Sequence, residues 1–110
     1  MEKIKQYQNV ITKILEEYAD YLKEPNLETQ VICDYQRNHF QLIKTGWDNG
    51  KRYHYCLFHF DIKNGKIWLQ ENRTDIRIAR EIEDLGIPKS DIVLGIHSPE
   101  ARARSGYAVA

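Results

Sequence analysis

Apolar side chains near the start of the chain recur with the period of a helix. Between residues 2 and 23 they lie three, four and seven positions apart, which places them on one face of an α-helix. Pro25 has no amide hydrogen to donate, so the helix cannot continue through it. We predict a helix over residues 2–23 whose buried stripe is formed by Ile4, Tyr7, Ile11, Ile14, Leu15, Tyr18 and Leu22.

After Pro25 the pattern changes to the shorter period of β-strands. The first such segment contains Val31, Ile32 and Cys33. Three further segments that favour strands follow it. Stretches containing glycine and asparagine separate these segments, as expected of turns. We predict four successive strands, at about residues 28–35, 39–47, 52–63 and 66–71.

A second helix and a last strand are predicted in the remaining third of the chain. Residues 75–85 return to helical spacing, Thr74 is a suitable N-cap, and "GIP" ends the helix. The sequence "DIVLGIH" predicts a strand over residues 91–97. Ser98 precedes a proline, which predicts a cap and a short helical turn near residues 99–104.

The order of these elements is α-ββββ-α-β, which indicates one α+β domain spanning residues 1–110. Strands that follow one another directly pair antiparallel, and the helix before the fifth strand permits one parallel pair. We therefore expect a mostly antiparallel five-stranded sheet with two helices on one face.

The turn at residues 64–65 sets the register of the third and fourth strands. Its sequence, "NG", is typical of a type I′ hairpin, because both central residues need positive φ. A two-residue loop pairs Ile62 with Ile67 and Phe60 with Leu69. A slip by one residue would break this apolar pairing, so we predict the first register.

The turn at residues 48–50 sets the register of the second and third strands. Its sequence, "DNG", fits a three-residue loop with Gly50 in the left-handed region. This register predicts three facing pairs, which are Leu42 with Cys56, Phe40 with Phe58 and His39 with His59.

The two registers together give the sheet two faces of different character. One face is apolar throughout and is assigned to the core: Phe40, Leu42, Cys56, Phe58, Phe60, Ile62, Ile67 and Leu69. The other face should be mainly polar if it is open to water, yet it carries aromatic and aliphatic residues, as protein contact surfaces do. We predict that another chain covers this face, most simply a second copy, through Ile43, Tyr53, Tyr55, Leu57, His59, Asp61, Trp68 and Gln70.

Charge and composition narrow the class of function. Sixteen basic residues balance sixteen acidic ones, whereas nucleic-acid-binding domains usually carry a basic excess. We interpret the arginines in the second half of the chain as a solvated surface: Arg73, Arg77, Arg80, Arg102 and Arg104. Direct DNA binding through these arginines is the less favoured alternative.

The chain shows no targeting or membrane-spanning pattern and no metal-binding cysteine spacing. Its N-terminus, "MEKIKQYQN", is charged, and its apolar runs are too short to span a bilayer. We expect a cytoplasmic protein in which Cys33 and Cys56 are reduced and half-buried. Because there is no glycine-rich phosphate loop, we expect no nucleotide cofactor.

Candidate chemistry is confined to a few residues. In the register given above, His39, His59 and Asp61 lie on one face, and two imidazoles with a carboxylate could hold a metal or share a proton. A small metal-assisted enzyme built on these three residues is the alternative hypothesis. No further ligand spacing supports it, so we predict no catalytic residues, no metal and no cofactor. A hydrogen-bonding role at an interface is favoured instead.

The C-terminus, "SGYAVA", is apolar, whereas chain ends are usually polar. Tyr107 and Val109 either pack on the domain's own surface or dock on a partner chain.

Several motifs together resemble one known family. They are "GW" at residues 46–47, "HFDIKNGKIWLQ" at 59–70, "LGIPKSDIVLGIHSPE" at 85–100 and the closing "YAVA". Over essentially the whole chain, this combination resembles the XisI-like proteins, which are called fdxN-element excision controlling factors. The sequence departs from the family pattern at "NRTDIRIAREI" and at Tyr107, where phenylalanine is usual.

The resemblance implies a regulatory function rather than a catalytic one. Proteins of this family are associated with programmed DNA rearrangement, in which a site-specific recombinase cuts and rejoins the DNA. The resemblance further implies an XisH-like partner and an indirect association with DNA through the recombinase complex. It supplies no catalytic residues. We therefore expect a non-enzymatic accessory factor that forms a homo-oligomer and binds an XisH-like protein.

Overall fold

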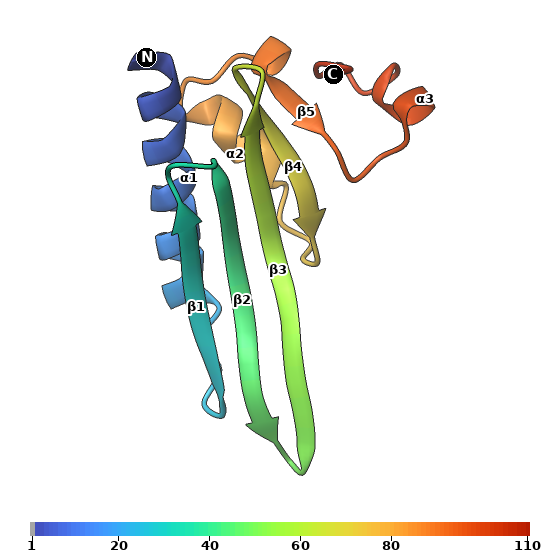
Figure 1. Ribbon diagram of the computed structural model, residues 1–110. Helices are drawn as coiled ribbons and strands as arrows, with labels where there is room; N and C mark the ends of the chain where they lie inside the picture. The colour runs from blue at the N-terminus through green and yellow to red at the C-terminus, as the bar shows by residue number, and fades with distance from the viewer. Residues whose placement is uncertain (1) are drawn as a thin grey trace.

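The computed structural model describes residues 2–110 and contains one five-stranded sheet (Figure 1). The first four strands pair antiparallel in chain order, and the fifth pairs parallel with the fourth at the edge. The predicted α+β class, strand number and mostly antiparallel sheet are confirmed. The strands are β1 (Leu27–Asp34), β2 (His39–Asp48), β3 (Lys51–Lys63), β4 (Lys66–Asn72) and β5 (Ile92–Leu94).

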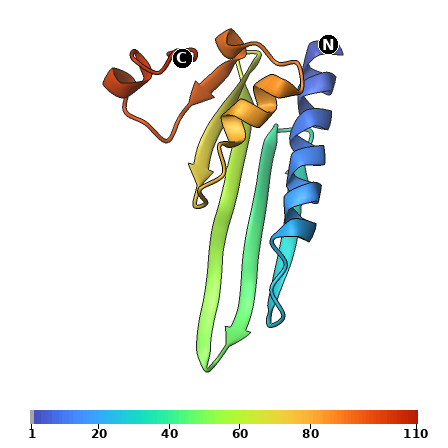
Figure 2. The ribbon, with the colours of Figure 1, turned by 180° about the vertical axis from the view of Figure 1, so that it is seen from behind.

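Two helices lie on the same face of the sheet, as Figures 1 and 2 show from opposite sides. The predicted N-terminal helix is α1 (Glu2–Tyr21), which buries Tyr7, Ile11, Ile14 and Leu15. The second helix is α2 (Ile78–Asp84). Because both helices pack on one face, the hydrophobic core lies between them and the sheet. Its sheet side consists of Phe40, Leu42, Leu57, Phe58, Phe60, Ile62, Ile67, Leu69 and Ile92.

The start of α2 lies later than predicted. Thr74 is not its N-cap, since the helix follows Arg77, which makes no side-chain capping bond. Instead, Asn72 organises the preceding loop: its Oδ1 accepts hydrogen bonds from the amide and hydroxyl of Thr74, and its Nδ2 donates to the carbonyl of Ile76. The Thr74 hydroxyl in turn accepts from the Ile76 amide at 3.1 Å. These bonds hold the segment in a turn and delay the helix.

The last strand is shorter than predicted, and the capped turn after it is confirmed. A short 3₁₀ helix, η1 (Lys89–Asp91), precedes β5, which ends at Leu94 instead of continuing to residue 97. The chain then turns, with a hydrogen bond from the amide of His97 to the carbonyl of Leu94. Ser98 caps α3 (Pro99–Arg102) by accepting from the amide of Ala101 at 3.2 Å.

The two hairpins whose registers were predicted differ in how well the sequence predicted them. At residues 64–65 the predicted turn and register are confirmed, with Ile62 facing Ile67. At the tip of the β2–β3 hairpin the loop has two residues rather than three, because Asn49 as well as Gly50 adopts positive φ. Asp48 therefore faces Lys51, and the predicted register is wrong from the turn onward.

A β-bulge at Leu57 changes the register of β2 and β3 a second time. Ile43 faces Cys56, but Leu42 faces Phe58, so Leu57 is the extra residue. An extra residue shifts the alternation of faces along the strand. The facing pairs become Phe40 with Phe60 and His39 with Asp61, in place of His39 with His59.

This register corrects the predicted assignment of β3 side chains to faces. Leu57 belongs to the core. Tyr55 packs against the core from the helix-covered side of the sheet, where Tyr55 faces the buried Lys44. Tyr53 lies on the same side, two residues away, and Cys56 leaves the core face because it pairs with Ile43. Tyr53, Tyr55 and Leu57 are therefore not part of the opposite face. The predicted contact face is less aromatic than the sequence indicated.

No helix within residues 2–110 combines the length and the apolar character needed to cross a bilayer.

Candidate functional site

We call the side of the sheet opposite α1 and α2 the outer face. Of the eight residues predicted to form a contact surface, five lie on it: Ile43, His59, Asp61, Trp68 and Gln70. His39 joins them because it faces Asp61 directly. The outer face therefore carries a polar cluster at the middle of the sheet.

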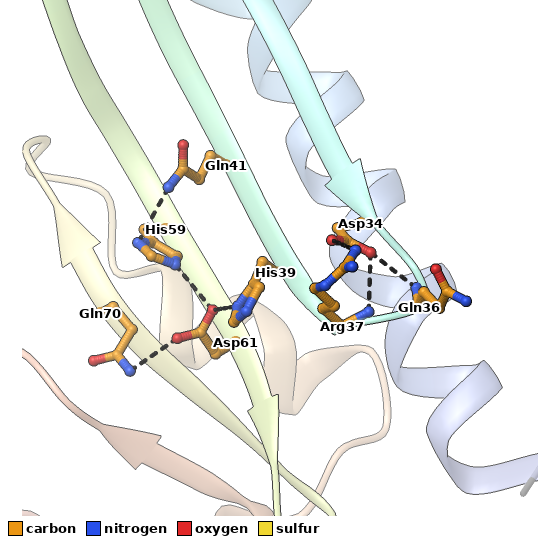
Figure 3. A network of polar contacts seen from close by, with 8 residues as sticks. All are labelled: Asp34, Gln36, Arg37, His39, Gln41, His59, Asp61 and Gln70. Carbon is orange, nitrogen blue, oxygen red and sulfur yellow. Dashed lines mark hydrogen bonds and ion pairs between the residues drawn. The ribbon is translucent and has the colours of Figure 1, made fainter.

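Asp61 is the centre of this cluster (Figure 3). Its Oδ1 accepts hydrogen bonds from His39 Nδ1 at 2.7 Å and from His59 Nε2 at 2.9 Å. Its Oδ2 accepts from Gln70 Nε2 at 3.1 Å. Behind His59, the Gln41 amide lies 3.5 Å from the Nδ1 atom. Strands β2, β3 and β4 each contribute, so the cluster exists only when the sheet is assembled.

The environment of Asp61 favours its ionised form. Burial by itself raises the pKa of this carboxyl, because a buried charge loses hydration. The hydrogen bonds from His39, His59 and Gln70 act in the opposite direction and outweigh burial, so the pKa lies below its usual value. Asp61 is thus a buried carboxylate whose charge is compensated by three donors.

The turn between β1 and β2 positions His39 at the start of its strand. The Asp34 carboxylate accepts from the amides of Gln36 at 3.0 Å and Arg37 at 2.9 Å (Figure 3). Asn38 completes the turn with φ 61°, a conformation that asparagine tolerates better than most residues. The backbone bond from the Arg37 amide is the largest cause that lowers the pKa of Asp34.

Trp68 lies on the outer face but is partly covered by its own chain. The Lys63 ammonium lies 4.3 Å from its ring centroid, and the Arg102 guanidinium of α3 lies 5.2 Å from it. Both separations are in the range of cation–π contacts. Trp68 is therefore less open to a partner than the sequence suggested.

The C-terminal segment divides into a docked part and an exposed part. Tyr107 packs against the core, and its hydroxyl donates a hydrogen bond to the carboxylate of Glu83 in α2. Burial and this bond raise the pKa of Tyr107 to about 12. Val109 is 55% exposed, although its carbonyl accepts from Arg102. Tyr107 thus docks on its own domain, while Val109 remains available for contact.

Two features escaped the sequence analysis. Lys44 is buried on the core face, where its ammonium contacts the carbonyl of Leu22 and lies 2.7 Å from the Glu24 carboxylate. Its position could have been predicted, because residue 44 continues the inward alternation of Phe40 and Leu42. The contact of Gln41 with His59 had no such signal, because the bulge is what places these two residues opposite each other.

The arrangement around Asp61 can hold a proton or a cation between its members. The ligand atoms offered by His39, His59 and Asp61 all lie within 4.8 Å of one another. Within the described part of the chain, this is the only group of three or more histidine, cysteine or acidic side chains with such spacing. The three residues suggested by the sequence do come together, although through a different register.

The fold and this face define a class of protein: a single α+β unit with a long N-terminal helix, a mixed five-stranded sheet and a polar cluster on the outer face. A model of the family described as XisI protein matches residues 1–109. The chain therefore belongs to the XisI family. No curated protein is detectably similar to it.

Two solved structures from Anabaena variabilis ATCC 29413 share this fold. A XisI-like protein has 42% sequence identity and a TM-score of 0.92, and the match covers 97% of this chain and 99% of that one. A protein called fdxN element excision controlling factor XisI has 34% identity and a TM-score of 0.87, with 98% and 99% covered.

Proposed function

We propose that this chain is a non-enzymatic accessory factor that helps to control the excision of a DNA element by a site-specific recombinase. Its similarity to a protein called an fdxN element excision controlling factor supports this role. The equal numbers of acidic and basic residues favour control through protein contacts, because direct binding to phosphates draws its affinity mainly from basic side chains.

The observation that carries the proposal is a row of apolar side chains along the outer face of β1 and β2. Trp47 is 63% exposed and Ile32 is 45% exposed. Ile43, half-buried, lies on the same face of β2 and diagonally across from Ile32. We call these three residues the outer patch. Large exposed apolar side chains grouped on one face are typical of contact surfaces.

The proposed occupant of the outer patch is a second copy of this chain. The patch lies on β1 and β2, on the face of the sheet opposite the one that α1 and α2 cover. A two-fold arrangement would place two such patches against each other and remove both from water. An XisH-like protein is the proposed second partner, and the exposed Val109 is its suggested contact. The association with DNA is then indirect, through the recombinase complex.

The mass in solution tests the self-association. We expect the unmodified chain to have a multiple of the 13.0 kDa chain mass in light scattering, and Trp47→Asp or Ile32→Asp to reduce it to that of one chain. Tyr21→Asp is the matched control, because Tyr21 is 77% exposed on α1, in the helix layer. A monomeric unmodified chain, or an oligomer that survives both outer-patch changes, would refute this contact.

Co-purification tests the partner. An XisH-like protein expressed with the chain should be retained by the unmodified chain and lost with Val109→Asp. Retention should persist in Tyr21→Asp. If the XisH-like protein is never retained, the proposed partnership is wrong, whatever the oligomeric state.

A further inference from the structure

We propose that His39, His59 and Asp61 form a binding site for a divalent transition-metal ion, with Zn²⁺ as the best-fitting ion. The site lies on the outer face and goes beyond the function proposed above. It does not depend on self-association or on an XisH-like partner, so either proposal can fail alone.

The spacing of the donor atoms supports the site. Two imidazole nitrogens, His39 Nδ1 and His59 Nε2, lie 2.7 Å and 2.9 Å from the same oxygen of Asp61. Ligand atoms around a tetrahedral zinc ion lie about 3.4 Å apart, given metal–ligand distances of about 2.0–2.2 Å. Each of the two nitrogens is therefore closer to Asp61 Oδ1, by about 0.5–0.7 Å, than ligands of one bound ion would be. The side chain of His39 is 55% exposed and that of His59 is 27% exposed, so each histidine can move by this amount.

The surrounding residues hold the donors in place. Asp61 Oδ2 accepts from Gln70, which fixes the carboxylate and leaves Oδ1 directed toward the two histidines. When His59 Nε2 binds a metal, its proton must reside on Nδ1. The Gln41 amide lies 3.5 Å from that atom, and rotation of the amide presents its oxygen as an acceptor. Such outer contacts orient histidine ligands in established metal sites.

The types of donor select the class of ion. Two neutral imidazoles and one carboxylate suit borderline ions such as Zn²⁺, whereas Mg²⁺ and Ca²⁺ prefer sites made of oxygen alone. Three protein ligands leave a fourth position open, as in zinc sites that bind an exchangeable ligand. His39 is the exposed member of the cluster. That fourth position is therefore reachable from solvent or by a partner's side chain.

The β-bulge at Leu57 is what assembles the site. Continuation of the register near the hairpin tip would place His39 opposite Phe60, whose side chain belongs to the core. The extra residue instead brings Asp61 opposite His39 and onto the same face. Bulges are often found where a strand re-aims side chains at a functional site.

Calorimetric titration with Zn²⁺ tests the proposal, using the full chain without a histidine tag. We expect one equivalent per chain, and an affinity reduced at least about tenfold in each of His39→Ala, His59→Ala and Asp61→Asn. His54→Ala and His97→Ala are matched controls, because those histidines lie outside the cluster. Circular dichroism verifies that each variant is folded. Absence of binding, or equal binding by the cluster variants, would overturn the proposal.

A second measurement needs no substitution. Imidazole ¹⁵N resonances report which nitrogen binds a metal, and titration of the unmodified chain with Zn²⁺ should shift those of His39 and His59. Resonances of His54 and His97 should stay in place. Shifts confined to His54 or His97 would place the ion elsewhere and contradict the proposal even if calorimetry detected binding.

Discussion

The Lys44 ammonium lies 2.7 Å from the Glu24 carboxylate, and the lysine itself is only 1% exposed. This pair ties the segment after α1 to the core face of β2. A buried cation that loses its partner is costly, because little water can reach it. We expect Glu24→Gln to lower the free energy of unfolding by about 2 kcal/mol, the usual contribution of a hydrogen bond to a charged group. Urea denaturation measures this change.

Two further variants control this prediction. Asp20→Asn breaks an exposed ion pair with Lys23 and should change the free energy of unfolding by less than about 1 kcal/mol. Lys44→Met removes the buried charge together with its need for a partner, so it should cost less than Glu24→Gln. An equal effect of Glu24→Gln and Asp20→Asn would show that burial does not strengthen the pair.

Acid should weaken the fold partly through Asp61. The folded state holds the pKa of this carboxyl below its usual value, through hydrogen bonds from His39, His59 and Gln70 that outweigh burial. Asp61 therefore stabilises the fold fully at pH values above about 4, the pKa of an aspartate in the unfolded chain. This stabilisation is lost as the pH falls through the lower pKa that Asp61 has in the folded state. We expect Asp61→Asn to lose less stability than the unmodified chain between pH 6 and 3, as measured by urea denaturation. Asp75→Asn, at an exposed position, is the matched control.

Alkali should weaken the fold through tyrosines that donate to carboxylates. Burial, and then the 2.6 Å bond to Glu81, raise the pKa of Tyr18 to about 12. The folded state thus keeps the hydroxyl proton of Tyr18, which the unfolded chain releases near pH 10. The stabilisation by Tyr18 is therefore fully present below about pH 10 and is lost as the pH rises toward 12. We expect Tyr18→Phe to reduce this fall in denaturation measured at pH 9 and 11. Tyr35→Phe, at another exposed position, is the control and should keep the decrease.

Gly95 keeps Gln70 in contact with Asp61. A Cβ atom at residue 95 would overlap Gln70 Oε1 and lie 3.2 Å from the Leu69 carbonyl. Since the glutamine side chain can move and the backbone cannot easily do so, Gly95→Ala should displace Gln70 from the carboxylate. We expect Gly95→Ala and Gln70→Ala to shift the imidazole resonances of His39 and His59 in the same direction.

Gly86→Ala controls for a glycine change that leaves Gln70 untouched. Residue 86 has φ +100° with no heavy atom within 4 Å of its Cβ position, so its substitution strains only the local backbone. It should lower stability without shifting the two histidine resonances. Unchanged resonances in Gly95→Ala would show that Gln70 does not orient the cluster.

Local patterns predicted the elements and one hairpin. The stripe of Ile11, Ile14 and Leu15 is buried as the helical period requires, and Asn64–Gly65 forms the expected turn with positive φ at both residues. Hydrophobic period and turn chemistry are properties of neighbouring residues, so they are visible without a fold. The same holds for the order of the strands, which is the order of the sheet.

Local patterns did not predict which side chains share a face in β3. The predicted three-residue loop placed Tyr55 and Leu57 on the outer face. The two-residue loop instead pairs Tyr55 with core-facing Lys44, and the bulge places Leu57 in the core. A bulge leaves one residue unpaired and re-aims the side chains around it, and no turn or spacing in the sequence marks its position.

The sequence by itself therefore determined the type and the order of the main helices and strands, because these follow from spacing along a few residues. Only the tertiary structure decided that His39 faces Asp61 and that Lys44 is buried beside Glu24. Those relationships arise from pairing and burial across the whole sheet, where one extra residue at position 57 changes every facing pair beyond it.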